Sequence, residues 1–165
     1  MITNVLRLLP CGLLWLALLV GCESPAPQLN APAAAFTLNP LNGGPVRFPD
    51  QYRGQVVAVH FWAAWCPYCL SEMAALEPIY RQRRDQGLRL LAINIMEDPD
   101  AVRAFVQKLG LSFEVLLDPE GEVMRRYGVM GLPATFMVDR QGIIRRRIMG
   151  ESTPEIFEAA IKDLL

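Results

Sequence analysis

Two cysteines separated by two residues, Cys66 and Cys69, carry the clearest chemistry in this sequence. Two thiols at this spacing can form and break a disulfide, and thiolate–disulfide exchange proceeds through a mixed disulfide with a second molecule. The pair follows the apolar run of residues 56–61 and stands where a helix is predicted to begin, at about residue 67. The N-terminal end of a helix favours negative charge, which lowers the pKa of a thiol below its usual value of about 8.5. We therefore expect Cys66 to cap the helix as an exposed, activated nucleophile, and Cys69 to be buried and to resolve the mixed disulfide.

The other two cysteines, Cys11 and Cys22, belong to the N-terminal segment. Residues 8–20 are an apolar run with the length of a signal-peptide core, too short to span a bilayer comfortably. The run ends in Leu-Val-Gly-Cys at residues 19–22, which resembles the bacterial lipobox. That resemblance implies a lipoprotein signal peptide over residues 1–21, a lipid on Cys22, and a domain outside the cytoplasm anchored to the membrane. An uncleaved signal anchor is the alternative. Cleavage and lipidation would leave Cys66 and Cys69 as the only free thiols.

Residues 22–35 are rich in proline and alanine and nearly uncharged, and we interpret them as an extended tether. Glu23 follows the lipobox cysteine, where Asp favours the inner membrane in Gram-negative bacteria. The sequence therefore leaves the inner and outer membranes open.

Strands and helices alternate along residues 36–165, which we assign to one α/β domain. Such alternation predicts a sheet with parallel strand pairs and helices on both faces. A hairpin comes first, across the turn at residues 42–45. The predicted strands are 36–38, 46–48, 56–61, 88–95, 113–117, 134–138 and 143–145, and the predicted helices are 67–86, 99–110, 119–127 and 153–165.

The stretch from Phe61 to Cys69, Phe-Trp-Ala-Ala-Trp-Cys-Pro-Tyr-Cys, resembles the active-site stretch of thioredoxin. With the lipobox, the tether and the early hairpin, the chain is similar to the TlpA/ResA/CcmG branch of membrane-tethered extracytoplasmic thioredoxins over residues 36–165. The resemblance implies a thioredoxin-like fold, with a central mixed sheet flanked by helices and an extra N-terminal hairpin. It implies reduction of disulfides in exported proteins, often during cytochrome c maturation. It also implies a membrane electron donor of the thiol-reductase type, and no cofactor beyond the Cys66–Cys69 disulfide.

A second signature of that family is matched by residues 131–136, Gly-Leu-Pro-Ala-Thr-Phe. By resemblance, Pro133 is cis and faces the disulfide, and the backbone of Leu132 pairs with substrate like an added strand. Trp65, Pro67 and Tyr68 belong to the same substrate-binding surface, and Pro67 also suits the first position of a helix. From the residues alone, Pro133 could equally be a proline at the start of a strand.

Two further residues are candidates for handling protons. Glu97 matches an acidic residue that ResA-like proteins place near the cysteines, where it could accept and return the proton of Cys69. It could also be an acid in the turn before the next helix. His60, the only histidine, aligns with a buried Asp of thioredoxin and could relay that proton or, if charged, favour the thiolate. It could also be a hydrogen-bonded core histidine that burial keeps neutral.

Composition and spacing exclude several other classes of function. The net charge of −1 gives no basic field for nucleic acid. Only His60 could join the two cysteines, too few for a zinc site. A peroxidase would need Thr-x-x-Cys. A copper-binding chaperone on this fold is a remaining alternative, although Sco-like copper proteins use Cys-x-x-x-Cys and a distal His, whereas here two residues separate the cysteines and His60 precedes Cys66 by six. A thiol oxidase or isomerase stays open, because the Pro-Tyr pair between the cysteines is that of many glutaredoxins. Ala134 stands where the CcmG subgroup usually has Glu, which weakens a specific assignment to cytochrome c maturation.

Overall fold

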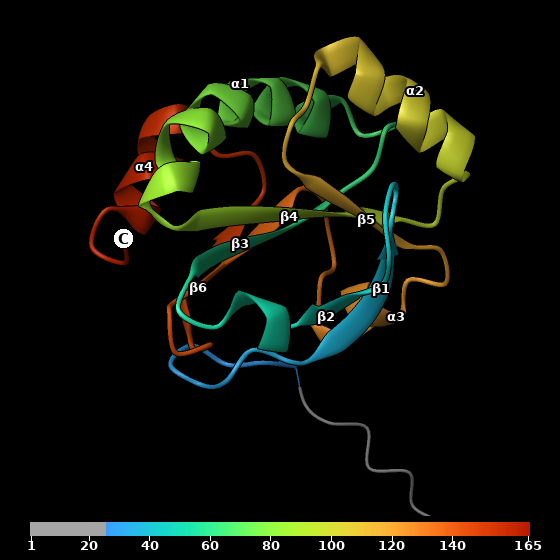
Figure 1. Cartoon of the computed structure of the whole chain (residues 1–165). Coiled ribbons are helices and arrows are strands. Elements are labelled where there is room, and N and C mark those ends of the chain that lie inside the picture. The colour runs from blue at the N-terminus through green and yellow to red at the C-terminus, as the bar shows by residue number, and fades with distance from the viewer. Residues whose placement is uncertain (1–25) are drawn as a thin grey trace, which may run out of the picture.

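The centre of the molecule is made of strands whose residues are almost all apolar. A computed structural model describes residues 26–165, in which seven strands form one sheet in the order β2-β1-β5-β4-β3-β6-β7 (Figure 1). Every residue of β3 is buried, as is nearly all of β4, so neither strand shows the alternation of a half-exposed strand. The strands are β1 (Phe36–Pro40), β2 (Val46–Phe48), β3 (Val56–Trp62), β4 (Leu88–Ile95), β5 (Glu114–Asp118), β6 (Ala134–Val138) and β7 (Ile144–Met149).

The sheet is mixed, as the sequence predicts. Strand β4 runs parallel to β3 and to β5, whereas β6 runs antiparallel to β3 and to β7. The N-terminal hairpin is not separate from the main sheet, because Asn39 and Pro40 of β1 pair with Leu117 and Leu116 of β5. The hairpin thus extends the sheet at one edge.

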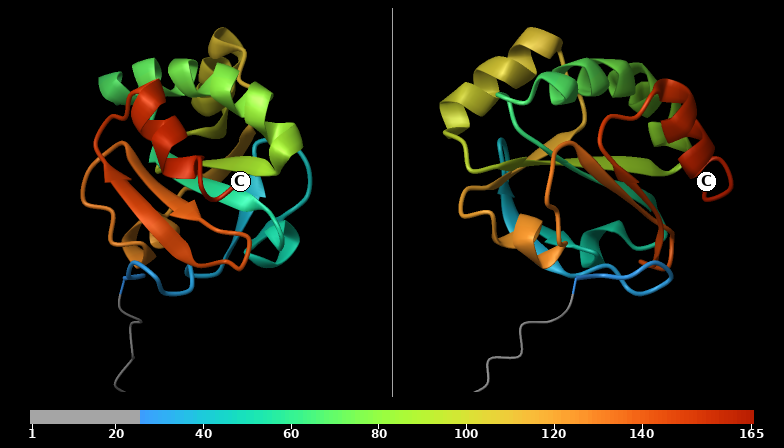
Figure 2. Two further views of the ribbon diagram at one scale, coloured as in Figure 1. Left: turned by 90° about the vertical axis from the view of Figure 1, so that its left-hand side faces the viewer. Right: turned by 180° about the vertical axis from the view of Figure 1, so that it is seen from behind.

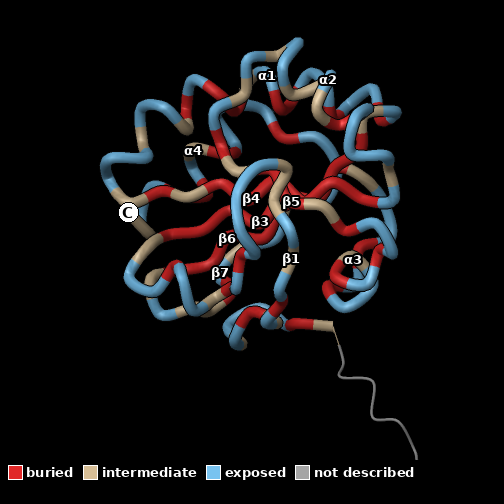
Figure 3. Tube along the Cα trace, turned by 45° about the vertical axis from the view of Figure 1, so that its right-hand side comes forward, coloured by how far each residue is buried: buried red, intermediate tan, exposed pale blue. Residues whose placement is uncertain are grey.

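Helices cover both faces of the sheet, also as predicted. Figures 1 and 2 show α1, α2 and α4 on one face and the short α3 on the other. In Figure 3 the strands are mostly buried, while exposed residues recur along the outer sides of the helices. The helices are α1 (Pro67–Arg83), α2 (Pro99–Leu109), α3 (Glu122–Arg126) and α4 (Pro154–Ile161), with 3-10 turns at Asp50–Tyr52 and Arg84–Gln86.

Local capping explains most helix boundaries. The side chain of Asp98 accepts a hydrogen bond from the N–H of Asp100 at the start of α2, and Thr153 caps α4 in the same way. Helix α3 begins three residues later than predicted. The reason is a turn ahead of it, in which Gly121 takes φ +64° and Asp118 accepts a hydrogen bond from the N–H of Met124 at 2.9 Å. The last helix ends at Ile161, before the predicted residue 165.

The N-terminal segment corrects one prediction. Residues 26–35 were expected to belong to a tether, yet residues 30–33 are hydrogen-bonded to the β6–β7 turn and to the first residue of β7, on the side of the molecule away from α1 (Figures 1 and 2). Asn30 N–H donates to Ile144 O at 2.8 Å, and Ala33 N–H donates to Gly142 O at 2.9 Å. Backbone hydrogen bonding to the exposed edge of β7 therefore orders a segment whose proline and alanine content suggested an extended chain. The predicted signal peptide (1–21), the predicted lipid-bearing Cys22 and the residues up to 25 lie outside the described residues.

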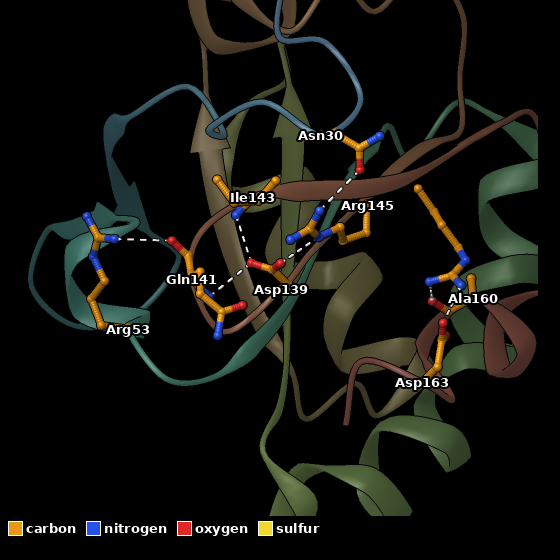
Figure 4. A network of polar contacts seen from close by, with 9 residues as sticks. Asn30, Arg53, Asp139, Gln141, Ile143, Arg145, Ala160 and Asp163 are labelled. Atoms are coloured by element: carbon orange, nitrogen blue, oxygen red, sulfur yellow. Dashed lines mark hydrogen bonds and ion pairs between the residues drawn. The ribbon is translucent and has the colours of Figure 1, made fainter.

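Three arginine side chains, two on β7 and one on α3, reinforce this docking. Arg147 donates to Pro27 O at 3.1 Å, and Arg126 donates to Ala35 O at 2.6 Å. Arg145 donates to the side chain of Asn30 at 3.2 Å and, through Nε, to Asp139 at 2.6 Å (Figure 4).

Within residues 26–165, no helix has both the length and the apolar character needed to cross a bilayer.

Asp139 is the centre of the network in Figure 4. Its carboxylate accepts hydrogen bonds from the N–H groups of Gln141 and Ile143, both at 2.9 Å, and from Arg145. Burial alone would raise the pKa of this carboxyl, but the hydrogen bonds from Ile143, Arg145 and Gln141 outweigh it, so the pKa lies below its ordinary value of 3.8. The charged form of Asp139 thus holds the β6–β7 turn and, through Arg145, the N-terminal segment.

We predict that Asp139→Asn lowers the free energy of unfolding at pH 7 by about 2 kcal/mol, because a buried charge-assisted hydrogen bond is lost. A carboxyl whose pKa is depressed by folding stabilises the fold above its unfolded pKa and loses that effect as the pH falls. The difference between wild type and variant should therefore shrink as the pH falls below 3.8. Urea unfolding across this range measures it. Asp163→Asn, which removes an exposed ion pair to Arg146, is the matched control and should change stability little.

Candidate active site

The first turn of α1 holds the two cysteines. Cys66 is the N-cap of the helix, and Pro67 occupies its first position, where a missing N–H costs nothing. Cys66 and Cys69 form a disulfide, and the N–H of Cys69 donates to Cys66 Sγ at 3.2 Å. The Cys66 sulfur therefore lies where the unpaired N–H groups of a helix end favour negative charge.

The exposure of Cys66 differs from the prediction. Cys69 is fully buried as expected, but Cys66 is also buried, with only 3% of its surface exposed. In the disulfide form its sulfur is bonded inward to Cys69 rather than directed to solvent. The exposed surface next to the disulfide belongs instead to Trp65 and Tyr68, which flank Cys66.

Pro133 comes to the same edge of the sheet through strand register. The Leu132–Pro133 peptide bond is cis. The next residue, Ala134, begins β6 and pairs with Phe61 near the end of β3, from which the chain leads into the cysteine motif. Gly150 N–H donates to Pro133 O at 2.9 Å. Among the hydrogen bonds of residues 26–165, none uses the backbone N–H or C=O of Leu132, so these groups are available to a partner.

Glu97 contacts the loop that precedes the cysteines. Its carboxylate accepts hydrogen bonds from the N–H of Ala64 at 2.7 Å and from the side chain of Asn94 at 2.6 Å. The residue before it, Met96, has φ +52°, a left-handed conformation that is unusual for a side chain of this kind. Glu97 is therefore more than an acid in the turn before α2, since it fixes the backbone two residues before Cys66.

His60 lies inside the sheet, fully buried on β3. Its Nδ1 is 2.9 Å from the hydroxyl oxygen of Thr135 on β6, the residue that pairs with it. Burial lowers the pKa of the imidazole to about 4, so His60 is neutral near pH 7. An imidazolium that would favour a thiolate is thus excluded at neutral pH, while a neutral relay stays open.

Glu72 is a buried acid on the cysteine-bearing helix that the sequence analysis did not single out. It lies three residues after Cys69 on α1, which makes the two side chains neighbours on one helix face, and it is 1% exposed. Burial raises the pKa of its carboxyl to about 7, against the opposing effect of hydrogen bonds from Ser152. The helical spacing of the buried residues Cys69, Glu72, Met73 and Leu76 is the signal that could have identified it.

The site thus contains a redox disulfide, a cis proline with open backbone groups beside it, and a carboxyl whose pKa is close to neutral. Within residues 26–165, no three or more His, Cys, Asp or Glu side chains are grouped so that they could hold a metal ion. This arrangement can exchange a disulfide with another molecule and move protons at neutral pH.

Comparison of the sequence with known proteins identifies a family and several relatives. The model of the AhpC/TSA family matches residues 29–147. The thiol-disulfide oxidoreductase ResA of Geobacillus thermodenitrificans is 35% identical over 133 residues, which cover 81% of this chain and 76% of that protein. ResA of Bacillus subtilis is 31% identical over 154 residues, which cover 92% of this chain and 84% of that protein.

Solved structures agree with the sequence relatives. A Chlorobium tepidum protein assigned as the thiol:disulfide interchange protein DsbE has a TM-score of 0.79 and 27% identity, and the match covers 84% of this chain and 99% of that one. StoA of Bacillus subtilis has a TM-score of 0.67 and 26% identity, covering 79% of this chain and 97% of that one. The chain therefore belongs to the AhpC/TSA family, among the ResA-like thiol–disulfide oxidoreductases, and has the thioredoxin-like fold that its sequence predicts.

Proposed function

We propose that this enzyme reduces disulfides of exported proteins through a cycle of Cys66 and Cys69. The observation that supports this most strongly is the position of Cys66 Sγ, at the first turn of α1 and within hydrogen-bond distance of the Cys69 N–H. The same N–H would stabilise the Cys66 thiolate in the reduced form.

The cycle has two exchanges. The Cys66 thiolate attacks one sulfur of the substrate disulfide, which forms a mixed disulfide and releases the first substrate thiolate. Cys69 then loses its proton and attacks the Cys66 sulfur, which releases the second substrate thiolate and leaves the Cys66–Cys69 disulfide. The substrate gains two electrons and two protons, and a membrane electron donor of the thiol-reductase type returns the enzyme to the dithiol.

Substrate binding is assigned to the surface around the disulfide. Leu132 offers its backbone N–H and C=O to an extended substrate segment, in the manner of an added strand, and cis Pro133 holds that backbone beside the cysteines. Trp65 and Tyr68 supply exposed aromatic surface on the other side, and Pro67 fixes the start of the helix between them.

We assign Glu72 as the general base that accepts the proton of the Cys69 thiol. A general base works best when its pKa is near the operating pH, and the pKa of about 7 at Glu72 meets that condition. Glu97 is assigned a positioning role, because both of its hydrogen bonds hold the chain around the cysteine loop. His60, neutral and bonded to Thr135, is assigned a supporting role inside the sheet.

Export and anchoring are further parts of the proposal. The lipobox at residues 19–22 supports a signal peptide and a lipid on Cys22, with the domain on the extracytoplasmic side. Because residues 26–35 dock on the domain, only residues 23–25 would separate the lipid-bearing cysteine from the folded body. The enzyme would then work close to the membrane surface, on disulfides of exported proteins.

We predict that Cys66→Ser abolishes turnover of a protein disulfide such as that of insulin, because no thiolate remains to attack. Cys69→Ser should still attack but should accumulate the mixed disulfide, because resolution is lost. Reduction of insulin under dithiothreitol and non-reducing gel electrophoresis of the trapped complex measure the two effects. Equal turnover by wild type and Cys66→Ser would refute the cycle.

The direction of electron flow is checked on the wild-type protein by equilibration with glutathione buffers. A reductase should have a potential below the glutaredoxin range of about −200 to −230 mV. A potential near about −120 mV, that of a strong oxidant, would assign the enzyme to thiol oxidation instead.

Glu72→Gln should change the pH dependence of the resolution step. In wild type the rate should rise as the pH passes about 7 and the carboxyl ionises, whereas in the variant this rise should be lost. Rapid-quench measurement of mixed-disulfide decay between pH 5 and 9 provides the test. An unchanged profile would remove Glu72 from proton transfer.

The same substitution has a stability signature. A carboxyl whose pKa is raised by folding destabilises the fold as the pH rises from its unfolded value of 4.5 to about 7. Relative to wild type, Glu72→Gln should therefore gain about 3 kcal/mol over this interval and little more above it. Glu120→Gln, at an exposed position, is the control and should follow wild type.

A further inference from the structure

Residues 26–35, which we call the docked segment, fix the place where the chain leaves the domain. Ala26 lies against Gly128, just beyond α3, where a Cβ on the glycine would be 2.8 Å from the Ala26 Cβ. Only residues 23–25 separate Ala26 from Cys22, the residue to which the proposed function assigns a lipid. Four residue steps span at most about 14 Å. A lipid on Cys22 therefore keeps the surface around Gly128 close to the bilayer.

Two arginines on this surface hold positive charge beside the docked segment. Arg126 of α3 donates to Ala35 O at 2.6 Å, and Arg147 of β7 donates to Pro27 O at 3.1 Å. The guanidinium carbon of Arg147 also lies 5.3 Å from the centre of the Phe136 ring. Both arginines are exposed, and a guanidinium has five N–H donors, so each keeps donors for a further partner.

The acidic side chains within residues 26–165 leave these two charges unpaired. Neither Arg126 nor Arg147 takes part in an ion pair there, whereas the other two arginines of β7 are each paired with an Asp. The docked segment itself contains no charged residue. The exposed acids nearest to Arg126 in the sequence, Glu120 and Glu122, lie at the start of α3, the end away from Gly128. The surface thus combines an uncharged segment with two fixed cations.

We propose that this surface lies on a phospholipid bilayer with anionic headgroups. Arg126 and Arg147 bind lipid phosphates, and Leu29 of the docked segment, 53% exposed, contacts the apolar part of the interface. The inference rests on the proposed lipid on Cys22, because electrostatic attraction falls off over a Debye length of about 8 Å in physiological salt. The lipid sets the distance of the domain from the bilayer, and the two arginines set its orientation.

The cysteines stay accessible in this orientation. Figures 1 and 2 show α1, α2 and α4 on the other side of the sheet from the docked segment. Helix α1 begins with the cysteine motif, so the bilayer covers neither Cys66 nor Cys69. The bound domain therefore presents its disulfide at a fixed height above the membrane.

Labels on the two sides of the molecule test this orientation. In the processed, lipidated and oxidised protein, the native cysteines are joined, modified or removed with the signal peptide, so an introduced cysteine is the only free thiol. Gln28→Cys places a fluorophore on the docked segment, and Gln107→Cys places it on α2; both glutamines are exposed. Vesicles of phosphatidylcholine, with or without phosphatidylglycerol, carry nitroxide on some headgroups. On the anionic vesicles the label at residue 28 should be quenched, whereas the label at residue 107 should lose little intensity.

Removing one charge should loosen the contact. Arg126→Gln and Arg147→Gln should each lower the ratio of docked to undocked protein about fivefold, the effect of about one charge at an anionic surface. Lys108→Gln is the matched control. Lys108 is exposed on α2 and has no ion pair within residues 26–165, so its substitution should leave the quenching unchanged.

Two further measurements separate lipid contact from docking of the segment itself. Exchange of the Asn30 and Ala33 amides in detergent reports whether the arginine variants keep the segment docked. Salt tests the Gln28→Cys protein with both arginines present. At about 1 M, where the Debye length is about 3 Å, quenching on anionic vesicles should fall to the level on neutral vesicles. This salt result decides the matter if an arginine variant releases the segment.

The outcomes separate this inference from the proposed function. Equal quenching of the two labels, stronger quenching at residue 107, or no difference between neutral and anionic vesicles would overturn the membrane-facing surface and leave the lipid anchor intact. Failure of the full-length protein to float with vesicles would overturn the anchor on Cys22, and the inference with it. Insulin reduction by the same samples reports separately on the redox cycle of Cys66 and Cys69.

Discussion

The contact between the first turn of α1 and the sulfur of Cys66 is the interaction on which the site depends. Cys66 is both the last residue before the helix and the group that would carry charge in the reduced state, so one residue combines a structural and a chemical role. The N–H of Cys69 meets the Cys66 sulfur, and the thiol of Cys69 lies one turn further along, close enough for the disulfide. Reactivity, disulfide geometry and helix capping are therefore parts of the same local structure.

The sheet positions the other residues that surround the two cysteines. Because β3 is buried on both faces, its end is fixed, and the cysteine loop starts from a rigid position. Register then brings cis Pro133 beside the end of β3 and Met149 beside Ala134, while Glu97 reaches back from the end of β4 to the N–H of Ala64. Residues from four strands thus meet at one edge, although more than eighty residues separate the first from the last.

Local signals explain what the sequence could predict, and long-range contacts explain what it could not. The proline that follows Cys66 marks the start of α1, and the apolar runs mark the central strands. Gly87 and Gly110, both with a left-handed backbone, mark the ends of helical segments. Each of these signals can be read without knowing the tertiary structure. The burial of Glu72 depends on Ser152, eighty residues away, and has no local signature apart from helical spacing. Docking of residues 26–35 depends on arginines that follow more than ninety residues later, so composition alone suggested a free tether. Cys66 is buried in the disulfide form, and the spacing of the two cysteines in the sequence does not report burial.

The pKa of the Cys66 thiol in the reduced enzyme tests the central claim most directly. Alkylation by iodoacetamide, followed as a function of pH with peptide mapping of the modified cysteine, gives both the pKa and the site. If the first turn of α1 stabilises the thiolate, Cys66 should react first, with a pKa clearly below the value of about 8.5 for a free cysteine. A pKa at or above that value, or modification of Cys69 ahead of Cys66, would contradict the account.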